Sequence, residues 1–520
     1  MSQKTAVVVG GGIAGLSTAA LLAKAGMKVK LFEAREKLGG RAYLWEKDGF
    51  RFDMGPSWYL MPDAFEQFFN LMGTTAEKEL DLVRLSPAYQ TRNEGLGDCL
   101  VMSDKLSEIK QMFESVERGS GEKLQKYLDS AQEAYELSIK HFLYTNFRDA
   151  RSFVHPEVLA KLGRFLKLLL TSLYDFSGKY VKDERLKKML NFPAVFLGAS
   201  PYNTPSMYHL MTHVDMSQGV FYPQGGLYTI IEAIERLARD AGVEIHTSSP
   251  VTKIIGENGK AIGIRVGEAE YRADVVVASA DLHFVETKLL EPKHQSLPQS
   301  WWDKKEPGPS ALLMYLGVKG KIDQLDHHTL LYTKDWSKNF AKVFRKADGK
   351  SEVPDPASLY ICMPSKTDPS VAPEGMENIF VLVPVAADTG IGGSGDPAFE
   401  AEADRVIEQI AQWCEIPDLA DRIVVRRTMG PRDFENELNA WSGTALGMAH
   451  TLSQSAFFRP KNYSKKLKNL FYTGHNTIPG IGLPMCLIGA ELVYKHLIDD
   501  RSSGPTRGEL KPVSNWKGLK

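Results

Sequence analysis

Three glycines near the start of the chain have the spacing of a loop that holds phosphate groups. Gly10, Gly12 and Gly15 directly follow the apolar run 5–9, and apolar residues at helical spacing then continue as far as Gly26. In such a strand–turn–helix unit the first glycine makes the tight turn. The second lets the backbone approach a pyrophosphate, and the third lets the helix pack closely on the strand. The positive end of the helix then faces the phosphates. The segment therefore predicts a dinucleotide site.

An acidic residue stands where this kind of site needs one. The next strand, 28–32, ends at Glu33, where a carboxylate would accept hydrogen bonds from the ribose of an adenosine. A solvated charge at the strand end is the alternative. A second glycine motif, 390–395, also follows a strand, but Asp396 and Pro397 come next, so its helix begins after the last glycine. We expect that copy to be a surface loop, and we expect no separate nicotinamide-nucleotide site.

The residues after Glu33 add a second set of contacts. Gly40 lets the chain turn over the nucleotide, and the fork of donors on Arg41 can reach a phosphate, although a surface salt bridge is the alternative. The pattern E-x(5)-G-G-R followed by D-x-G, which ends at Gly55, resembles the FAD-binding opening of the amine-oxidase and carotenoid-desaturase superfamily. The resemblance implies that FAD is the dinucleotide.

Two later segments fit the same cofactor. In the resembling family a block like 221–226 returns the chain to the FAD domain, and the residue that matches Val251 meets the adenine edge through its backbone. Near the end of the chain, a strand is followed by a loop with Gly474 and Gly482 and by a helix that Pro484 opens. The positive end of that helix, aimed at the N1–C2 oxygen edge of the flavin, would stabilise the anionic reduced flavin. An ordinary loop-to-helix junction would look the same on its own.

The resemblance narrows to the bacterial-type phytoene desaturases over nearly the whole chain, from about Thr5 to Leu497. It is carried by D-M-G-P-S, Y-P-x-G-G, SQSAFFRP and G-x-x-T-x-P-G-x-G-x-P. It implies desaturation of phytoene or a related long polyene by hydride transfer to flavin N5, with oxygen or a quinone as the external electron acceptor. The last loop departs from the family pattern at His475, Asn476 and Ile478, which leaves the particular carotenoid open.

A carboxylate between two arginines stands in the region expected to hold the substrate. Asp149 is the candidate proton acceptor, with Arg148 and Arg151 beside it. A surface ion-pair cluster is the more ordinary interpretation of these three residues. The reaction needs no covalent nucleophile, because catalysis would consist mainly of positioning a C–H bond against the flavin.

Composition and charge bound the remaining possibilities. The chain has 520 residues, and 63 basic against 64 acidic residues give a net charge of -1, so we expect no nucleic-acid partner. The four cysteines are far apart and form no C-x-x-C pair, which favours a reducing compartment and no metal site. Glycines interrupt the first apolar run, which argues against a signal peptide or a membrane anchor.

A polyene substrate requires an apolar tunnel and dissolves in the lipid bilayer, so we expect a cytoplasmic protein that touches the membrane peripherally. One helical face of the inserted region could lie on a membrane surface, although a buried helix with a charged rim explains the pattern nearly as well. The apolar residues of that face are Leu162, Phe165, Leu166, Leu169 and Leu173, with Lys161, Arg164 and Lys167 between them.

Together these elements predict an α/β protein with a Rossmann-type FAD-binding domain and an inserted α+β substrate domain, like that of the amine oxidases and carotenoid desaturases. The FAD domain takes 1–75, 221–295 and 440–500, the substrate domain takes 76–220 and 296–439, and 501–520 forms a flexible tail. Rival functions are a carotenoid isomerase, a carotenoid oxygenase or an amine oxidase. A rival of another class is a non-catalytic escort protein for lipids or prenyl groups.

Overall fold

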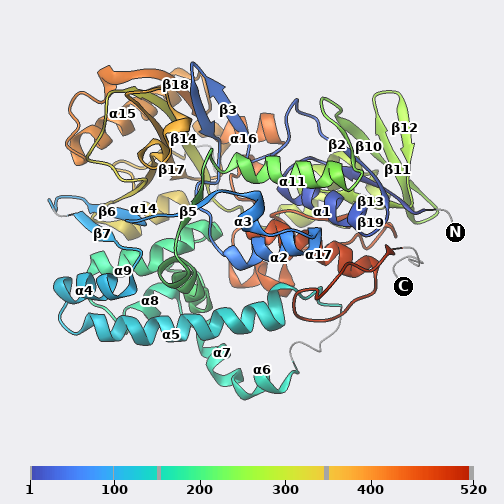
Figure 1. The fold of residues 1–520 in the computed structure, drawn as a ribbon, viewed down its shortest axis with the longest axis horizontal. Helices are drawn as coiled ribbons and strands as arrows, with labels where there is room; N and C mark the ends of the chain where they lie inside the picture. Colours follow the sequence, from blue (N-terminus) through green and yellow to red (C-terminus); the bar gives the residue numbers. More distant parts are fainter. Residues whose placement is uncertain (1–2, 98, 149–153, 345–350, 514–520) are drawn as a thin grey trace.

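The computed structural model describes residues 3–97, 99–148, 154–344 and 351–513. Figure 1 shows a parallel-sheet region on the right, a second large sheet at the upper left and a group of helices at the lower left. The short helices α6 (Pro156–Ala160) and α7 (Leu162–Leu170) lie lowest in this view. The class is α/β with a Rossmann-type sheet, as the sequence predicts.

The five-stranded parallel sheet is assembled from three distant parts of the chain. Its order is β19-β13-β1-β2-β9, and each neighbouring pair is parallel. The strands are β1 (Thr5–Val9), β2 (Lys28–Phe32), β9 (Glu244–His246), β13 (Val275–Ala278) and β19 (Leu470–Tyr472). Because the strands are parallel, the loops after β1, β13 and β19 meet at one edge of the sheet. The first and last predicted glycine segments, 10–15 and 474–482, are therefore brought to the same edge, whereas the segment 221–226 is β8 (Phe221–Pro223) and the turn that leads into α11 (Tyr228–Asp240).

Both faces of this sheet are covered, which explains why β1 and β13 are almost purely apolar. Ala6 and Val8 pack in the core that holds α1 (Ile13–Lys24) and α17 (Leu483–Leu497), whereas Val7 and Val9 pack in a second core. That second core includes residues of an antiparallel sheet of three strands. They are β10 (Val251–Glu257), β11 (Lys260–Val266) and β12 (Ala269–Arg272). Helix α11 (Tyr228–Asp240) packs beside α1.

The second large sheet has seven strands in the order β18-β14-β17-β16-β15-β6-β7. Only the β15–β6 pair is parallel. The strands are β6 (Tyr89–Asn93), β7 (Cys99–Met102), β14 (Ser310–Lys319), β15 (His328–Tyr332), β16 (Leu359–Cys362), β17 (Met376–Val385) and β18 (Ile423–Met429). Helix α15 (Pro397–Trp413) covers one face of the sheet through Phe399, Ala403 and Val406.

The remaining elements connect these layers. The helices are α2 (Pro62–Met72), α3 (Ala76–Glu79), α4 (Leu106–Val116), α5 (Ser120–Ser138), α8 (Leu173–Ser177), α9 (Glu184–Asn191), α10 (Leu210–His213), α12 (Leu282–Phe284), α13 (Gln299–Trp302), α14 (Trp336–Val343) and α16 (Pro431–Leu438). The strands β3 (Leu44–Lys47) and β4 (Phe50–Asp53) pair with each other, as do β5 (Leu82–Arg84) and β8 (Phe221–Pro223).

Three local expectations can be compared with these elements. The second glycine motif is followed by α15, which begins at Pro397 with Asp396 as its N-cap, as predicted. Helix α17 begins one residue before Pro484, so the proline is its second residue and does not open it. The leucine-rich helix ends at Leu170, because Ser172 caps the separate helix α8. The five predicted apolar residues consequently do not share one face, and Phe165 and Leu173 are buried.

The tail after residue 500 also differs from the prediction of a loose segment. Residues 501–513 lie along α17: the Lys495 ammonium donates to the carbonyls of Ser502 and Gly504, and Val513 is buried. The polar composition of the tail gave no sign of these contacts. They are formed between the backbone of the tail and buried side chains of α17, such as Lys495.

Candidate functional site

The glycine loop contains one glycine that the packing of the protein itself does not require. An added Cβ at Gly15 would lie 2.0 Å from the carbonyl oxygen of Gly10, and one at Gly10 would lie 3.0 Å from the backbone nitrogen of Ala280. At Gly12 the φ angle is an ordinary -67°, and an added Cβ would meet no atom nearer than 3.9 Å. A glycine at this position is explained by a group outside the protein that approaches the backbone, as a pyrophosphate does.

Two helices present bare N-termini toward this edge of the sheet. The N-caps are Gly12 for α1 and Gly482 for α17, and neither provides a side-chain hydrogen bond. Neither helix has an acidic residue in its first turn. The first N–H groups and the positive ends of both helices therefore remain available for the oxygen atoms of an anionic ligand.

Glu33 lies beside the glycine loop at the end of β2. Its Oε2 accepts a hydrogen bond from the Gly11 N–H at 2.6 Å, and its Oε1 accepts one from the Arg35 N–H at 2.9 Å. The Ser249 N–H donates to the Glu33 carbonyl at 2.8 Å, which brings the start of β10 at Val251 next to this strand end. The two residues predicted to contact the adenosine half of FAD thus lie on adjacent segments.

The chain after Glu33 folds back across the glycine loop. Gly12 forms a parallel bridge with Gly39, and an added Cβ at Gly40 would lie 3.2 Å from the Gly12 Cα. Gly55 is pressed against Arg41, since an added Cβ at Gly55 would lie 2.4 Å from the Arg41 carbonyl oxygen. The G-G-R and D-x-G segments are therefore packed on each other over the predicted phosphate site.

The Arg41 side chain connects all three parts of the site. Its Nε donates to the Ala445 carbonyl at 2.9 Å, its Nη2 lies 3.8 Å from the Asp281 carboxylate, and its Nη1 lies 3.5 Å from His475 Nδ1. Desolvation by burial opposes the charge on Asp281, but contacts with His475 and Arg41 outweigh it and lower the pKa of that carboxyl. Burial, followed by the charge of Arg41, lowers the pKa of His475 to about 4. At neutral pH the cluster holds an ion pair and a neutral imidazole.

The last glycine loop borders the first. Gly474 follows β19 with a φ of +122°, and an added Cβ there would meet only the Ser279 carbonyl oxygen, at 3.9 Å. Ser279 also bounds the first loop, because an added Cβ at Gly15 would lie 2.9 Å from the Ser279 Cβ. The loop ends at Gly482, which has a φ of +118° and begins α17. The candidate site therefore spans from Glu33 across the glycine loop to the N-terminus of α17.

Of the predicted catalytic trio, only Arg148 belongs to the described residues, and it does not lie at this edge. The Arg148 guanidinium binds the Asp499 carboxylate at 2.5 Å, just beyond the C-terminal end of α17. A helix of 15 residues spans about 22 Å, so Arg148 lies a helix length away from Gly482. Asp149 and Arg151 lie outside the described residues. Their predicted role as proton acceptor and partner is therefore untested.

A buried aromatic cluster close to the site was missed by the sequence analysis. Trp58, three residues after Gly55, stacks on His328 with ring centroids 4.2 Å apart. The Tyr360 hydroxyl binds both Ser57 Oγ and His328 Nδ1 at 2.8 Å. Tyr89, Phe192 and Phe196 complete the ring of side chains around Trp58. The run G-P-S-W gave only a weak signal, since the partners of Trp58 come from distant strands.

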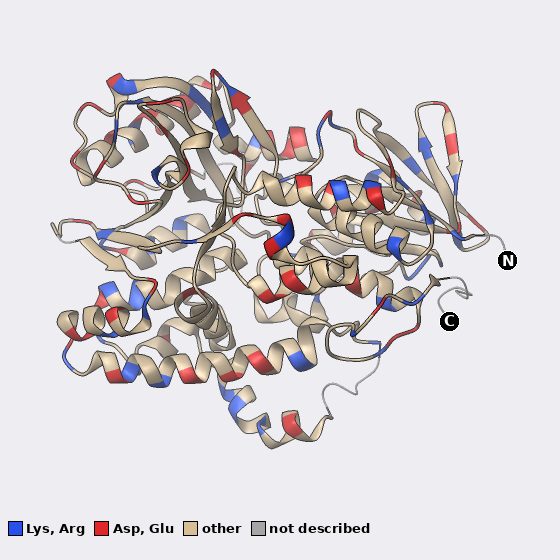
Figure 2. Cartoon of the chain, viewed as in Figure 1, with Lys and Arg blue, Asp and Glu red and all other residues tan. Residues whose placement is uncertain are grey.

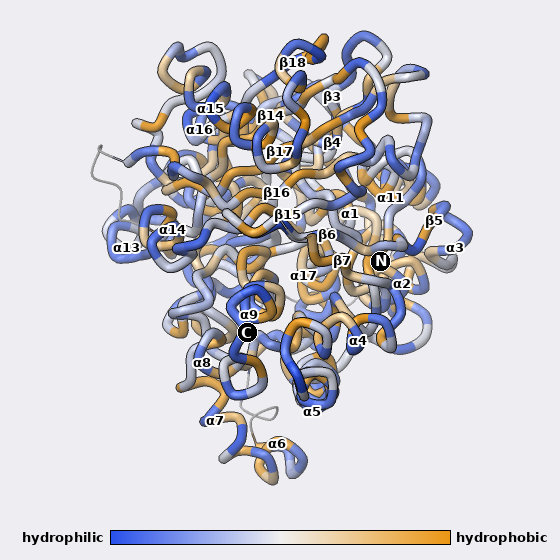
Figure 3. Tube along the Cα trace, turned by 90° about the vertical axis from the view of Figure 1, so that its left-hand side faces the viewer, coloured by the Kyte–Doolittle hydropathy of each residue, from blue (hydrophilic) through white to orange (hydrophobic). Residues whose placement is uncertain are grey.

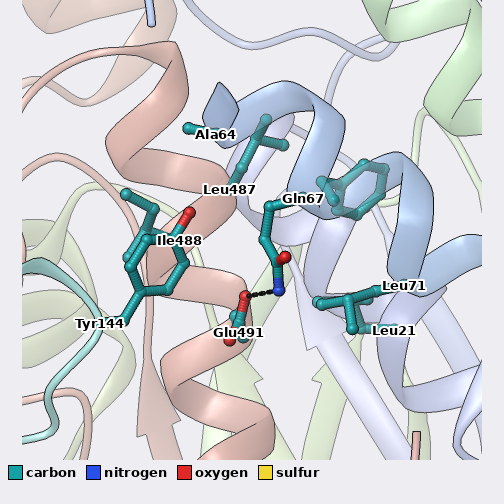
Figure 4. Close-up of a pocket in the computed structure, with 9 residues that line it drawn as sticks. Leu21, Ala64, Gln67, Leu71, Tyr144, Leu487, Ile488 and Glu491 are labelled. Atoms are coloured by element: carbon teal, nitrogen blue, oxygen red, sulfur yellow. Dashed lines mark hydrogen bonds between the residues drawn. The ribbon is translucent and has the colours of Figure 1, made fainter. Parts of the chain in front are cut away.

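A crevice between α1, α2 and α17 is filled by packing. Leu21, Leu71 and Ile488 line it, and Gln67 Nε2 donates to the Glu491 carboxylate at 3.1 Å (Figure 4). The crevice is too narrow to admit a water molecule, so it is not a ligand site.

Most of the chain matches known proteins. The model of the family "Flavin containing amine oxidoreductase" matches residues 13–492. The carotenoid 3,4-desaturase of Haloarcula japonica is 40% identical over 500 residues, which are 96% of this chain and 99% of that protein. The zeta-carotene-forming phytoene desaturase of Myxococcus xanthus is 34% identical over 497 residues, which are 95% of this chain and 93% of that protein.

A solved structure supports the same fold. An oxidoreductase from Methanosarcina mazei superposes with a TM-score of 0.62 at 18% identity, covering 94% of this chain and 100% of that one. The description of the matching family names a flavin as its cofactor. FAD is the flavin that the dinucleotide-binding unit accommodates, because it carries a pyrophosphate and an adenosine. The chain belongs to the flavin-containing amine oxidoreductase family, in the group that includes the carotenoid and phytoene desaturases.

Proposed function

We propose that this protein is an FAD-dependent carotenoid desaturase that introduces double bonds into phytoene or a related long polyene. The observation that carries the proposal is the similarity to two such desaturases over almost their entire length. The convergence of the first and last glycine segments on one sheet edge supports it, because a desaturase needs a bound two-electron acceptor.

The residues around the sheet edge fit FAD. Gly12 and the N-terminus of α1 would hold the pyrophosphate, and Glu33 would bind the adenosine ribose. Gly482 and the N-terminus of α17 would face the oxygen edge of the ring. Bound FAD supplies a two-electron acceptor: one saturated carbon gives up a hydride, its neighbour loses a proton, and the bond between them becomes double.

The aromatic cluster around Trp58 supports an apolar substrate. It lies directly after the D-M-G-P-S segment, so it borders the predicted flavin site on the side of the seven-stranded sheet. A hydrocarbon has no polar handle, and its affinity must come from buried apolar area, at about 25 cal/mol per Å². The partly exposed rings of Trp58 and Phe196 offer that area to a polyene, whereas Tyr360 and Phe192 are buried behind them in the cluster.

Product analysis separates this activity from its rivals. FAD-loaded protein is incubated with phytoene in liposomes, and the products are separated by chromatography. A desaturase lengthens the conjugated chromophore and shifts its absorption to longer wavelength. An isomerase leaves the number of double bonds unchanged, and an oxygenase adds oxygen to the product. A colourless protein that carries no flavin would instead favour the escort function.

Membrane contact is the second part of the proposal. No helix in the described part of the chain is long and apolar enough to cross a bilayer. Helix α7 carries hydrophobic residues alternating with hydrophilic ones (Figure 3), and Leu170 at its end is 79% exposed. Leu162 and Leu166 are exposed on the same side, and Leu159 of α6 and the pair Phe457 and Phe458 are exposed as well. Such a surface is suited to insertion at the headgroup level.

The charges around α7 fit an anionic membrane. Figure 2 shows basic residues along this helix. A pocket of about 510 Å³ between α5, α7 and α8 includes Lys126, Arg164, Lys167 and Lys179, against the acids Asp129 and Glu133. The net positive charge of this lining would attract phosphate headgroups.

Vesicle binding tests the membrane surface. Leu170→Asn removes an apolar side chain from this surface, and Val424→Asn removes a similarly exposed one from β18. Loss of one inserted leucine costs about 1.5–3 kcal/mol, so we expect at least tenfold weaker binding for Leu170→Asn and unchanged binding for Val424→Asn. Equal binding by both variants and the unaltered protein would exclude α7 as the docking surface.

A further inference from the structure

Arg459 is a buried arginine below the last glycine loop. Its side chain is 1% exposed. Nη2 donates to the His475 carbonyl at 2.6 Å, and Nη1 donates to the Gln454 carbonyl at 3.2 Å. Nη1 also lies 3.4 Å from Nε2 of His450. Nε has no hydrogen-bond partner among the described residues. The guanidinium is thus held by neutral groups.

Within the described part of the chain, no carboxylate forms an ion pair with Arg459. The nearby acid Asp281 is engaged by Arg41 and His475. Burial lowers the pKa of Arg459 to about 10, so the side chain still carries its charge at neutral pH. A buried charge without a counter-charge is strongly unfavourable. The energetic need for a negative partner points to a ligand that gains or carries negative charge here.

The position of Arg459 indicates which ligand that is. His475 directly follows Gly474, and an added Cβ at Gly480 would lie 2.8 Å from the same His450 Nε2 that faces Arg459. Gly480 stands two residues before Gly482, the N-cap of α17. Arg459 therefore supports the loop that leads into the helix N-terminus assigned to the flavin ring.

We propose that the fixed positive charge of Arg459 raises the reduction potential of the bound flavin, by stabilising the negative charge that the ring gains when it takes up electrons. This inference rests on the proposed function, which places the flavin ring at the N-terminus of α17. Arg459 acts through its charge together with the helix end and does not itself touch the polyene. Its effect is to make hydride removal from an unactivated hydrocarbon more favourable.

The test separates the effect of the Arg459 charge on the flavin from the effect of its hydrogen bonds. Arg459→Gln removes the charge, and Arg459→Lys keeps it. A matched control is Arg422→Gln, since Arg422 also binds two backbone carbonyls, those of Lys319 and Lys321, but lies at β14 and β18. Each purified holoprotein is titrated with sulfite, which adds to electron-poor flavins and bleaches their absorbance. The midpoint potential is measured by equilibration with a redox dye. FAD content and the dissociation constant for FAD are measured on the same samples.

We expect the sulfite dissociation constant to rise about tenfold in Arg459→Gln. For a two-electron couple, a tenfold decrease in the equilibrium constant for reduction corresponds to a midpoint potential about 30 mV lower. The sulfite dissociation constants of Arg459→Lys and Arg422→Gln should stay within threefold of that of the unaltered protein. Equal shifts in Arg459→Gln and Arg459→Lys at every pH, including pH values at which the lysine is protonated, would mean that Arg459 only holds the loop, and no shift in either would mean that its charge is not felt by the ring. Either result would overturn the proposal.

Two further outcomes are distinguishable. Weaker FAD binding by Arg459→Gln with an unchanged potential would assign the charge to the FAD phosphates and would also overturn the proposal.

If Arg459→Gln does not accumulate as a holoprotein, Arg459→Lys carries the test alone. A buried ammonium loses its proton at a lower pH than a guanidinium, so its sulfite affinity must decrease with rising pH relative to the unaltered protein. Parallel pH profiles would refute the role. None of these measurements uses the polyene. A failure of the proposed desaturase activity can therefore be distinguished from a failure of the role proposed for Arg459.

Discussion

Replacement of Gly12 by alanine separates cofactor binding from folding. The added Cβ meets no protein atom nearer than 3.9 Å, and the φ of -67° suits alanine. The free energy of unfolding of the FAD-free protein should therefore change by less than about 1 kcal/mol. The methyl group occupies the side from which the pyrophosphate approaches, and each lost hydrogen bond to a charged group costs about 1.5–3 kcal/mol. We expect the dissociation constant for FAD to rise at least a hundredfold, which is about 2.7 kcal/mol.

Gly15→Ala is the matched variant. Its Cβ would lie 2.0 Å from the Gly10 carbonyl oxygen, so helix α1 must move away from β1. Overpacking of this kind costs about 1–3 kcal/mol or more, and the FAD-free protein should become less stable. Denaturant unfolding of the FAD-free proteins gives the stabilities, and flavin fluorescence titration gives the dissociation constants. Normal FAD binding by Gly12→Ala, or equal destabilisation by both variants, would refute the assignment of Gly12 to the phosphate.

Three other predictions concern single side chains. Glu33→Gln removes the charge that we propose binds the adenosine ribose, and we expect about tenfold weaker FAD binding in the same titration; unchanged binding would mean that Glu33 only supports the Gly11 backbone. Trp58→Ala removes the ring stacked on His328, and turnover with phytoene should fall at least tenfold while FAD stays bound; full turnover would show that the cluster does not meet the substrate. Burial raises the pKa of Asp215 to about 7, so the folded protein keeps a proton that the unfolded chain releases near pH 4. The free energy of unfolding should then fall between about pH 4 and 7, by up to about 4 kcal/mol; Asp215→Asn should flatten that slope, and an unchanged slope would exclude this carboxyl as its source.

The parts of the fold that could be predicted are those encoded by local patterns. The glycine spacing after β1 and the acid at Glu33 depend on neighbours in sequence, and the parallel sheet follows from runs of apolar residues such as 275–278. The adjacency of Gly474 to the first loop was implied by the resemblance, and in the structure it follows from the parallel strands that place both loops at one edge of the sheet. In the strand order β19-β13-β1, only β13 separates the strand before Gly474 from the strand before Gly10.

The remaining features depend on contacts between distant residues. Trp58 and His328 stack across 270 positions, and no local pattern marks that pair. Arg459 is buried although arginine is usually exposed. The carbonyl of Gln454 and the imidazole of His450 come from the residues just before it, and a second carbonyl comes from His475 in the last glycine loop. The break between α7 and α8 also involves a distant segment, because Ser172, the N-cap of α8, forms a bridge with Pro205 and the Leu173 N–H donates to the Thr204 carbonyl at 2.9 Å.

Anaerobic single turnover tests the central claim most directly. FAD-loaded protein is mixed with excess phytoene in vesicles without any electron acceptor, and flavin absorbance is recorded while the products are quantified. The account predicts that the oxidised flavin bleaches and that one new carbon–carbon double bond forms for each flavin lost. New double bonds without bleaching of the flavin, or bleaching without a longer chromophore, would contradict it.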